Sequence, residues 1–249
     1  MPDSCLIALP VYNEVECIRQ VCTEWLQLAA DHGDCRVLVV NDGSNDGTAE
    51  VLRELARTNP LLTVIDRPNG GHGTALLAAY RSALGSGHQW IFQVDSDRQF
   101  SAADFPLLWA ERARSRFILG WRRWRQDSRL RIVLSNLHRW LLVTLFGASA
   151  RDPNIPYRLM RVSLLREMLP ALPDQCFAPN VLLSVLACRV GEDTRDIPIQ
   201  HLARRTGIVS IRGWKTAKIA VRCLLELVRF RFRGFARFPR AVTAPDLLR

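Results

Sequence analysis

Short apolar runs alternate with amphipathic segments along the first part of the chain. The runs are rich in Val, Ile and Leu and have the length of buried parallel strands. We expect four strands, at Leu6–Pro10, Val37–Asn41, Leu62–Asp66 and Trp90–Val94. Apolar positions at helical spacing predict helices between them, at Glu14–Ala30, Thr48–Arg57 and Thr74–Leu84. Such a βαβ series predicts an α/β protein with a doubly wound sheet, whose ligands lie beyond the carboxyl ends of the strands.

Beyond Phe105 the hydrophobic pattern is less regular. Further strands are expected at Phe117–Gly120, Tyr157–Met160 and Thr194–Gln200. Further helices are expected at Phe105–Arg114, Leu130–Phe146, Phe177–Arg189 and Arg212–Arg233. Because no Ser/Gly-rich linker interrupts the chain, we assign residues 1–211 to one domain and residues 212–249 to a basic, amphipathic C-terminal extension.

Charge is distributed unevenly, although the whole chain has a net charge of +10. Residues 1–111 contain 7 Arg and 15 acidic residues, whereas residues 112–249 contain 27 basic and 9 acidic residues. A basic half usually binds an anionic partner, such as nucleic acid, an acidic membrane surface or a phosphorylated substrate. The 7 cysteines form neither a CxxC pair nor a tight metal-ligand cluster. Their odd number in a chain of this size argues against a disulfide scaffold and favours a reducing compartment.

The strongest local signal is the triplet Asp95-Ser96-Asp97, which directly follows the apolar run Trp90–Val94. Two carboxylates at positions i and i+2 after a buried strand, together with Gln99, can bring oxygen ligands onto one hard divalent cation. Mg²⁺ or Mn²⁺ suits this ligand set and would share its coordination with phosphates of a substrate. The alternative from the same residues is a solvated turn, because Asp and Ser are common turn formers.

Two other polar segments stand at predicted strand ends. The segment NDGSNDGT at residues 41–48 opens a helix, and a capped turn accounts for all of it except Asp42. The segment NGGHGT at residues 69–74 enters another helix, and its backbone N–H groups can approach a phosphate or a sugar. This segment matches neither the Rossmann nor the Walker glycine pattern, which disfavours a dinucleotide or P-loop ATP site.

These motifs, in this order, resemble the family-two inverting glycosyltransferases of GT-A fold. The resemblance rests on PVYNE at residues 10–14, NDGSNDGT at 41–48, NGGHGTALLAA at 69–79 and DSDRQ at 95–99. Over residues 5–212 the chain is similar to polyprenyl-phosphate glycosyltransferases, including the dolichyl-phosphate mannose synthases. The resemblance implies a doubly wound mixed sheet and a metal-dependent transfer of a hexose from a GDP- or UDP-sugar to polyprenyl phosphate.

The resemblance also implies a role for each residue that matches a motif of the family. The donor-binding positions are Pro10, Tyr12, Glu14, Asp42, Gly71 and Gly73, with Asp42 near the base of the nucleotide. The positions that would hold Mg²⁺ or Mn²⁺ on the donor diphosphate are Asp95, Asp97 and Gln99. The acceptor-side positions are Arg122, Arg131, Ser135, Asp152 with Arg158, and Arg204.

The sequence departs from the family pattern at three places. His72 stands where many relatives have Lys, so a titratable group replaces a permanent cation near the donor phosphate. Residues 154–158 read NIPYR in place of the usual Ser-Gly-Phe-Arg, and residues 207–210 are one residue longer than the common Gly-x-Ser. These departures concern the identity of the sugar and of the acceptor more than the type of reaction.

The chemistry of the acceptor decides which residues the reaction needs. A phosphate acceptor needs no general base, because its oxygen is already anionic at neutral pH and guanidinium groups can position it. We therefore expect Arg122, Arg131 and Arg204 to bind this phosphate, with Ser135 as a hydrogen-bond donor. If the acceptor is a sugar or lipid hydroxyl, Asp152 would have to deprotonate it. A nucleic-acid-binding protein would also explain the arginines but leaves the acidic strand-end residues without a purpose, and we expect no nucleic-acid partner.

The last predicted helix, from Arg212, has a mostly cationic stripe opposite an apolar face. Such a helix can lie in the interface of an anionic bilayer, where each basic side chain contributes roughly 1 kcal/mol. Leu137–Phe146 can form a second wedge, whereas packing of the last helix on the protein's own core is the alternative. No secretory signal and no apolar run of about 20 residues is visible. We expect a peripheral protein on the cytoplasmic side of the cell membrane, with an integral-membrane protein as a further candidate partner.

Overall fold

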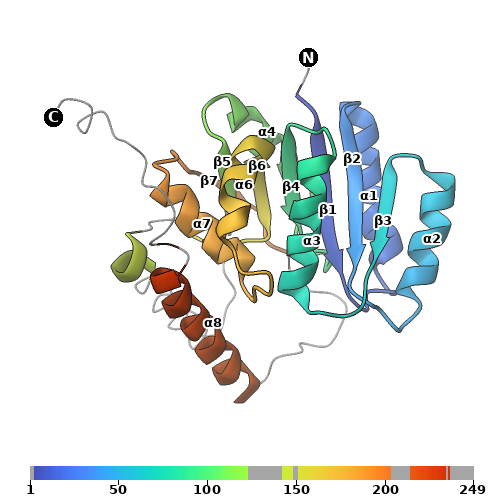
Figure 1. Ribbon diagram of the computed structural model, residues 1–249. Coiled ribbons are helices and arrows are strands. Elements are labelled where there is room, and N and C mark those ends of the chain that lie inside the picture. The colour runs from blue at the N-terminus through green and yellow to red at the C-terminus, as the bar shows by residue number, and fades with distance from the viewer. Residues whose placement is uncertain (1–2, 123–141, 148–150, 203–213, 234, 236–249) are drawn as a thin grey trace.

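The computed structural model describes residues 3–122, 142–147, 151–202, 214–233 and 235 (Figure 1). At residues 214–220 and 233 only the helical backbone is described. The predicted acceptor residues Arg131, Ser135 and Arg204 lie outside these ranges, as do most of the helix predicted at Leu130–Phe146 and the segment 207–210.

A seven-stranded mixed sheet forms the centre of the molecule, which confirms the predicted α/β class. Its strands are β1 (Cys5–Val11), β2 (Cys35–Asn41), β3 (Leu62–Asp66), β4 (Trp90–Val94), β5 (Phe117–Arg122), β6 (Tyr157–Arg161) and β7 (Arg195–Ile199). They lie in the order β3-β2-β1-β4-β6-β5-β7. The strands β1, β2, β3 and β4 all run parallel to one another. β6 is antiparallel to β4 and β5, and β7 is parallel to β5. The strand order reverses beside β1, and such a switch point is where open α/β sheets bind ligands.

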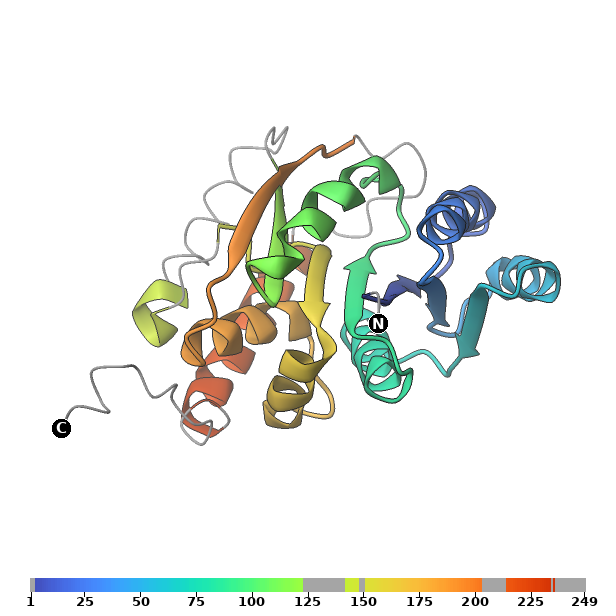
Figure 2. The ribbon, with the colours of Figure 1, turned by 90° about the horizontal axis from the view of Figure 1, so that it is seen from above.

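Helices cover both faces of the sheet (Figure 2). The helices are α1 (Ile18–His32), α2 (Thr48–Thr58), α3 (His72–Gly85), α4 (Phe105–Ala110), α6 (Val162–Met168), α7 (Pro179–Arg189) and α8 (Trp214–Arg233). α1 and α4 lie on one face, whereas α3, α6, α7 and α8 lie on the other. Every strand predicted from the sequence is present, because short apolar runs between turn residues have few alternatives to a buried strand.

The largest differences from the predicted helices are at α1, at the helix after Phe105 and at α6, whereas α3, α7 and α8 begin within two residues of the predicted positions. α1 begins at Ile18 rather than at Glu14, because Asn13 has a φ of 54° and the chain turns before the helix begins. The helix predicted at Phe105–Arg114 ends as an α-helix at Ala110 and continues as a 3₁₀ turn at Glu111–Ala113. α6 was not predicted, since seven residues are too few to show a helical period.

Aromatic side chains fill the space between the sheet and the α1/α4 layer. Phe92 of β4 lies at the centre, with its ring centroid 5.4 Å from that of Trp25, 5.0 Å from Phe105 and 4.7 Å from Tyr157. All four side chains are buried. Burial of each of these side chains contributes roughly 1.5–3 kcal/mol to the stability of the fold, because its apolar surface is removed from water. This cluster anchors β4, the strand that carries Asp95 and Asp97 beyond its end.

α8 packs on the body of the protein through one side of the helix. Leu227 and Phe230 are buried there, and the Phe230 ring lies 6.3 Å from that of Phe146. Glu226 accepts hydrogen bonds from the backbone N–H groups of Phe177 and Ala178, at 2.7 and 2.9 Å, directly before α7. Within the described residues, no helix combines the length and the apolar character needed to cross a membrane.

Candidate functional site

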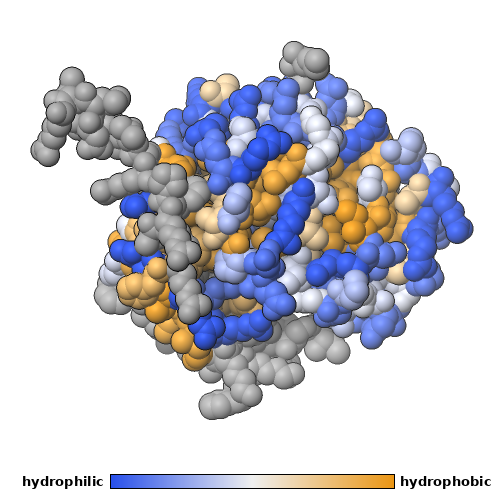
Figure 3. Space-filling view, viewed as in Figure 1, coloured by the Kyte–Doolittle hydropathy of each residue, from blue (hydrophilic) through white to orange (hydrophobic). Residues whose placement is uncertain are grey.

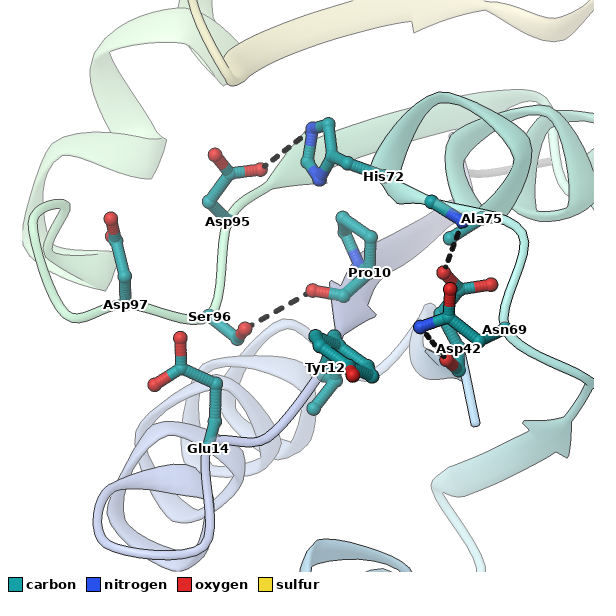
Figure 4. Close-up of a pocket in the computed structure, with 12 residues that line it drawn as sticks. Pro10, Tyr12, Glu14, Asp42, Asn69, His72, Ala75, Asp95, Ser96 and Asp97 are labelled. Carbon is teal, nitrogen blue, oxygen red and sulfur yellow. Dashed lines mark hydrogen bonds and ion pairs between the residues drawn. The ribbon is translucent and has the colours of Figure 1, made fainter. Parts of the chain in front are cut away.

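A pocket of about 350 Å³ lies beyond the carboxyl ends of β1, β2 and β4 (Figure 4). Its lining includes most of the residues predicted to bind the donor and the metal, namely Pro10, Tyr12, Glu14, Asp42, Gly71, Asp95 and Asp97. Their convergence follows from the parallel strands, whose carboxyl ends meet at one edge of the sheet. Gly73 and Gln99 do not line the pocket.

Asp95 and Asp97 form the acidic side of the pocket. In Figure 4 their carboxylates extend to the same side of the segment that joins them. Ser96, between them, points the other way and donates its hydroxyl hydrogen to the Pro10 carbonyl at 3.1 Å, which ties the end of β4 to β1. Asp97 Oδ1 accepts the backbone N–H of Gln99 at 3.1 Å. These two contacts fix the loop after β4. The contact between Gln99 and Asp97 is one that a turn also makes, so the cation-binding role of the pair stays a prediction.

Burial raises the pKa of Asp95 to about 6, and the charge of Asp97 acts in the same direction, whereas His72, Arg158 and Arg122 lower it. The Nε2 atom of His72 lies 3.8 Å from Asp95 Oδ1. A bound divalent cation would favour the ionised carboxylate. The described residues contain no group of three or more His, Cys, Asp or Glu side chains that could hold a metal. Two hard carboxylates with open positions for phosphate oxygens still fit the way Mg²⁺ and Mn²⁺ bind substrate diphosphates.

Asp42 organises the glycine-rich segment instead of standing free. Its carboxylate is 2% exposed and accepts from Arg67 Nη1 at 2.8 Å and from the backbone N–H groups of Gly70 and Gly71 at 3.1 and 2.7 Å. The Asn69 side chain donates to the Asp42 carbonyl at 3.0 Å. The backbone N–H groups of Gly70 and Gly71 are therefore bonded to Asp42 rather than free, whereas Gly71 still lines the pocket and its contact with a donor stays a prediction.

Gly73 has a packing role in the structure. A Cβ atom at this position would lie 2.0 Å from the carbonyl oxygen of Cys176 and 2.7 Å from that of Phe177. Only glycine lets the start of α3 approach the segment before α7 this closely. This contact places His72, the next residue back along the chain, beside Asp95.

The loops after β1 and β2 are joined by a set of hydrogen bonds that the sequence analysis did not predict. Asn13 donates its backbone N–H to Ser44 Oγ at 2.9 Å, and its side-chain oxygen accepts the N–H of Asn45 at 2.9 Å. Glu14 N–H is bonded to Thr48 Oγ1 at 3.0 Å, and Val15 N–H to Asp46 Oδ2 at 3.1 Å. These contacts fix Tyr12 and Glu14 at the mouth of the pocket.

On the acceptor side, the structure describes Arg122, Asp152 and Arg158 among the predicted residues. Arg122 Nε lies 3.0 Å from Asp152 Oδ2. Arg158 is fully buried, and its guanidinium donates to the backbone carbonyls of Ile155, Pro153 and Asn180 at 2.8 to 3.0 Å. The expectation that Arg158 faces an acceptor is therefore wrong, because its donors are used inside the core.

The sequence analysis also missed a buried polar chain behind Asp95. Gln93, Asn180 and Tyr80 connect to one another by side-chain hydrogen bonds and are almost fully buried. Gln93 is a lone polar residue within an apolar run, and Asn180 and Tyr80 come from distant segments. The position of Gln93, two residues before Asp95 on β4, was the one signal that could have drawn attention to it.

The mixed sheet, the switch point beside β1 and the acidic pair at the end of β4 together define the GT-A fold. The solved structure of glucosyl-3-phosphoglycerate synthase from Mycobacterium tuberculosis in complex with Mn²⁺ and UDP-glucose matches with a TM-score of 0.68. The alignment covers 92% of this chain and 79% of that chain, at 18% identity. The match confirms the predicted fold class.

The family model of glycosyl transferase family 2 matches residues 6–169, and the chain belongs to this family. Curated relatives include undecaprenyl-phosphate 4-deoxy-4-formamido-L-arabinose transferases. The protein of Pseudomonas fluorescens (strain Pf0-1) is 29% identical over 83% of this chain, and that of Edwardsiella ictaluri (strain 93-146) 27% identical over 81%. The chain spans 60% and 61% of the length of these two relatives.

Proposed function

We propose that the protein transfers a sugar, with a hexose as first candidate, from a GDP- or UDP-sugar to a polyprenyl phosphate, with inversion at the anomeric carbon. The observation that carries this proposal is the pair Asp95 and Asp97 in a pocket at the switch point of a family 2 chain. The relatives named for transfer to undecaprenyl phosphate support the lipid acceptor, and the structural neighbour bound to Mn²⁺ and UDP-glucose supports the donor class.

In this proposal, residues 1–111, the acidic part of the chain, bind the nucleotide-sugar donor. Asp95 and Asp97, with Gln99 as a predicted third ligand, would hold Mg²⁺ or Mn²⁺ against the donor diphosphate. Held by these residues, a divalent cation would supply positive charge that stabilises the leaving nucleoside diphosphate. Pro10, Tyr12 and the segment anchored by Asp42 form the rest of the pocket wall and would contact the nucleoside.

The acceptor step needs positioning more than proton transfer. An anionic phosphate oxygen forms the new bond to the anomeric carbon as the bond to the diphosphate breaks, and the electron pair leaves with the diphosphate. Arg122, together with Arg131, Ser135 and Arg204, would orient this phosphate and reduce its repulsion with the donor. The charge of Arg122 reaches Asp95, on which it acts to lower the pKa. Arg122 ends β5, which runs in the same direction as β4 because β6 between them is antiparallel to both. Arg122 and Asp95 are therefore at the same edge of the sheet, which supports an acceptor site next to the donor pocket.

A hydroxyl acceptor with Asp152 as general base is the second candidate. Asp152 is mostly buried and lies next to Arg122, so a carboxylate is present in the right region. The Arg122 Nε atom already occupies Asp152 Oδ2 at 3.0 Å, and a carboxylate engaged in a charge-assisted contact suits an ion-pair role better than proton abstraction. We therefore favour the phosphate acceptor.

The exposed side of α8 supports a peripheral location on the cytoplasmic face of the cell membrane. Five apolar side chains share this side of the helix and are exposed, namely Val221, Leu224, Leu225, Val228 and Phe232. Figure 3 shows hydrophobic surface at the lower left of the molecule, where α8 runs in Figure 1. Arg229 flanks this stripe on the same helix, whereas the Arg222 guanidinium lies 4.8 Å from the centre of the Phe177 ring on the body of the protein. An apolar stripe beside a basic residue matches an anionic bilayer surface.

The test is a transfer assay with undecaprenyl phosphate, and in parallel with undecaprenol as a hydroxyl acceptor, a panel of UDP- and GDP-sugars, and Mn²⁺ or Mg²⁺. We expect a sugar-lipid product that is lost with EDTA and with Asp97→Ala. Asp174→Asn is the matched control, because Asp174 is a surface carboxylate that is 97% exposed and paired with Arg81. Product formation by Asp97→Ala at the rate of the unmodified protein would refute the metal site, and product formed only with hydroxyl acceptors would refute the phosphate acceptor.

A further inference from the structure

Gln93 lies directly behind the acidic pair of the pocket. Side chains two positions apart on a strand point to the same face of the sheet, so Gln93 and Asp95 both face the layer that holds α3 and α7. The Nε2 atom of Gln93 donates a hydrogen bond to Asp95 Oδ1 at 3.2 Å. Gln93 is completely buried and therefore contacts no substrate itself.

Two further side chains continue this contact into the core. Asn180, in the first turn of α7, donates its Nδ2 hydrogen to Gln93 Oε1 at 3.0 Å. Tyr80, in the middle of α3, donates its hydroxyl hydrogen to Asn180 Oδ1. The resulting chain runs Tyr80, Asn180, Gln93, Asp95 and joins α3, α7 and β4.

The direction of every hydrogen bond in the chain follows from its last member. An ionised Asp95 only accepts, so Gln93 must present its NH₂ group to it. The carbonyl oxygen of Gln93 then faces Asn180, which must present its own NH₂ group, and the Asn180 oxygen is left to accept from Tyr80. Reversing the amides would place the Gln93 oxygen against the Asp95 carboxylate. The chain therefore favours the orientation in which the NH₂ group of Gln93 faces Asp95 and its oxygen faces Asn180.

The start of α7 is itself fixed. Arg158 Nη1 donates to the Asn180 backbone carbonyl at 2.9 Å, and Ser184 Oγ donates to the same carbonyl at 3.0 Å. Asn180 therefore has little freedom to follow Gln93 if Asp95 moves. Buried polar side chains whose hydrogen bonds are all made allow one arrangement of their donors and acceptors. Apolar side chains of the same size would fill the same space but would not orient Asp95.

We propose that Gln93 is a positioning residue for the cation ligand Asp95, with Asn180 and Tyr80 holding Gln93 in its donating orientation. The inference rests on the proposed metal site at Asp95 and Asp97. Hydrogen-bonded partners of metal ligands fix ligand orientation, and their removal typically weakens metal binding or activity by about 10- to 100-fold. Gln93 acts through Asp95 and touches no reacting atom.

The test is the affinity of the protein for Mn²⁺ alone, measured from the electron paramagnetic resonance signal of free Mn²⁺. We expect Gln93→Leu to weaken this affinity by about tenfold or more, and Tyr80→Phe, which removes one oxygen atom, to weaken it by about threefold. The Mn²⁺ concentration for half-maximal transfer should rise in parallel, whereas the KM for undecaprenyl phosphate should not change. If Gln93 only stabilised the fold, its removal would not weaken Mn²⁺ binding while leaving the KM for undecaprenyl phosphate unchanged.

Ser82→Ala is the matched control, because Ser82 lies on α3 as Tyr80 does, loses one oxygen atom in the change, and donates its hydroxyl hydrogen to the backbone carbonyl of Ala78 outside the polar chain. Its Mn²⁺ affinity should equal that of the unmodified protein. Unchanged affinity in a folded Gln93→Leu protein overturns the inference; if that variant does not fold, unchanged affinity in Tyr80→Phe does so. Asp97→Ala separates the two proposals: retained Mn²⁺ binding in that variant refutes the metal site, whereas its loss combined with normal binding in Gln93→Leu refutes only the positioning role.

Discussion

The donor pocket and the surface beyond β5 hold their charged groups in different ways. In the pocket, Asp42 is fixed by two backbone N–H groups as well as by Arg67. Beyond β5, Arg122 and Asp152 are joined through their side chains, with 22% of the Arg122 side chain exposed. Backbone donors cannot move without refolding the loop, whereas a side-chain pair can exchange partners. For the proposed function, this difference predicts a rigid donor pocket and, next to it, an Arg122 side chain that can turn from Asp152 toward an incoming phosphate.

The largest effect is expected from Asp42→Ala. This change leaves two backbone N–H groups and the Arg67 guanidinium without their acceptor in a buried place, and we expect it to lower the free energy of unfolding by about 3 kcal/mol. Urea denaturation measures the loss. Asp66→Asn is the control, because Asp66 is about half exposed and accepts from the Asn41 side chain. A loss below about 1 kcal/mol for Asp42→Ala would show that the pocket is not anchored in this way.

Gly73→Ala tests the contact between the donor pocket and the segment before α7. The added methyl group would overlap two backbone carbonyl groups, which cannot move as a side chain could, so we expect a loss of about 2 kcal/mol in stability. Gly85→Ala, at the other end of α3, meets no atom within 4 Å and should instead stabilise the protein by about 0.5 kcal/mol. Thermal unfolding of both variants provides the measurement, and equal midpoints would contradict the close approach.

The acceptor side is tested by a pair of variants. We expect Arg122→Ala to raise the KM for undecaprenyl phosphate by about tenfold or more, since a charge-assisted contact to phosphate is lost, while donor affinity stays unchanged. Asp152→Asn should lower kcat by less than about tenfold, whereas loss of a general base typically costs 10²- to 10⁴-fold. Steady-state kinetics, measured while the concentration of each substrate is varied in turn, distinguishes a phosphate acceptor from a hydroxyl acceptor. A kcat loss of the larger size would favour a hydroxyl acceptor.

The elements of the fold and the acidic pair could be predicted from the sequence, because both depend on local pattern. Apolar runs such as Trp90–Val94 have one common structural solution, and the residue after a parallel strand lies at the ligand edge of the sheet. Asp95 and Asp97 were found by this rule. Asp42 was found as well, but its bonds to Gly70 and Gly71 were not, since they depend on how two loops meet.

The buried polar groups could not be predicted from the sequence, because their contacts also depend on how distant segments meet. Arg158 was expected on the acceptor side beside Asp152, although most arginines of a folded protein are exposed. It lies in the core because backbone carbonyls of Pro153, Ile155 and Asn180 converge on it, and no sequence pattern encodes this convergence. The positive φ of Asn13 likewise follows from its bonds to the loop after β2.

The smallest effect is expected on the exposed side of α8, where Leu225 is 49% exposed. Leu225→Ala should leave the stability of the protein within about 0.5 kcal/mol, because a half-exposed side chain contributes little to the core. It should weaken binding to vesicles that contain phosphatidylglycerol by several-fold, since each CH₂ group inserted into a bilayer contributes about 0.8 kcal/mol. Leu107→Ala is the matched control, because Leu107 is also 49% exposed but lies on α4, away from α8. Equal vesicle binding by both variants would mean that α8 does not contact the membrane, and the basic acceptor half would then need another route to its lipid.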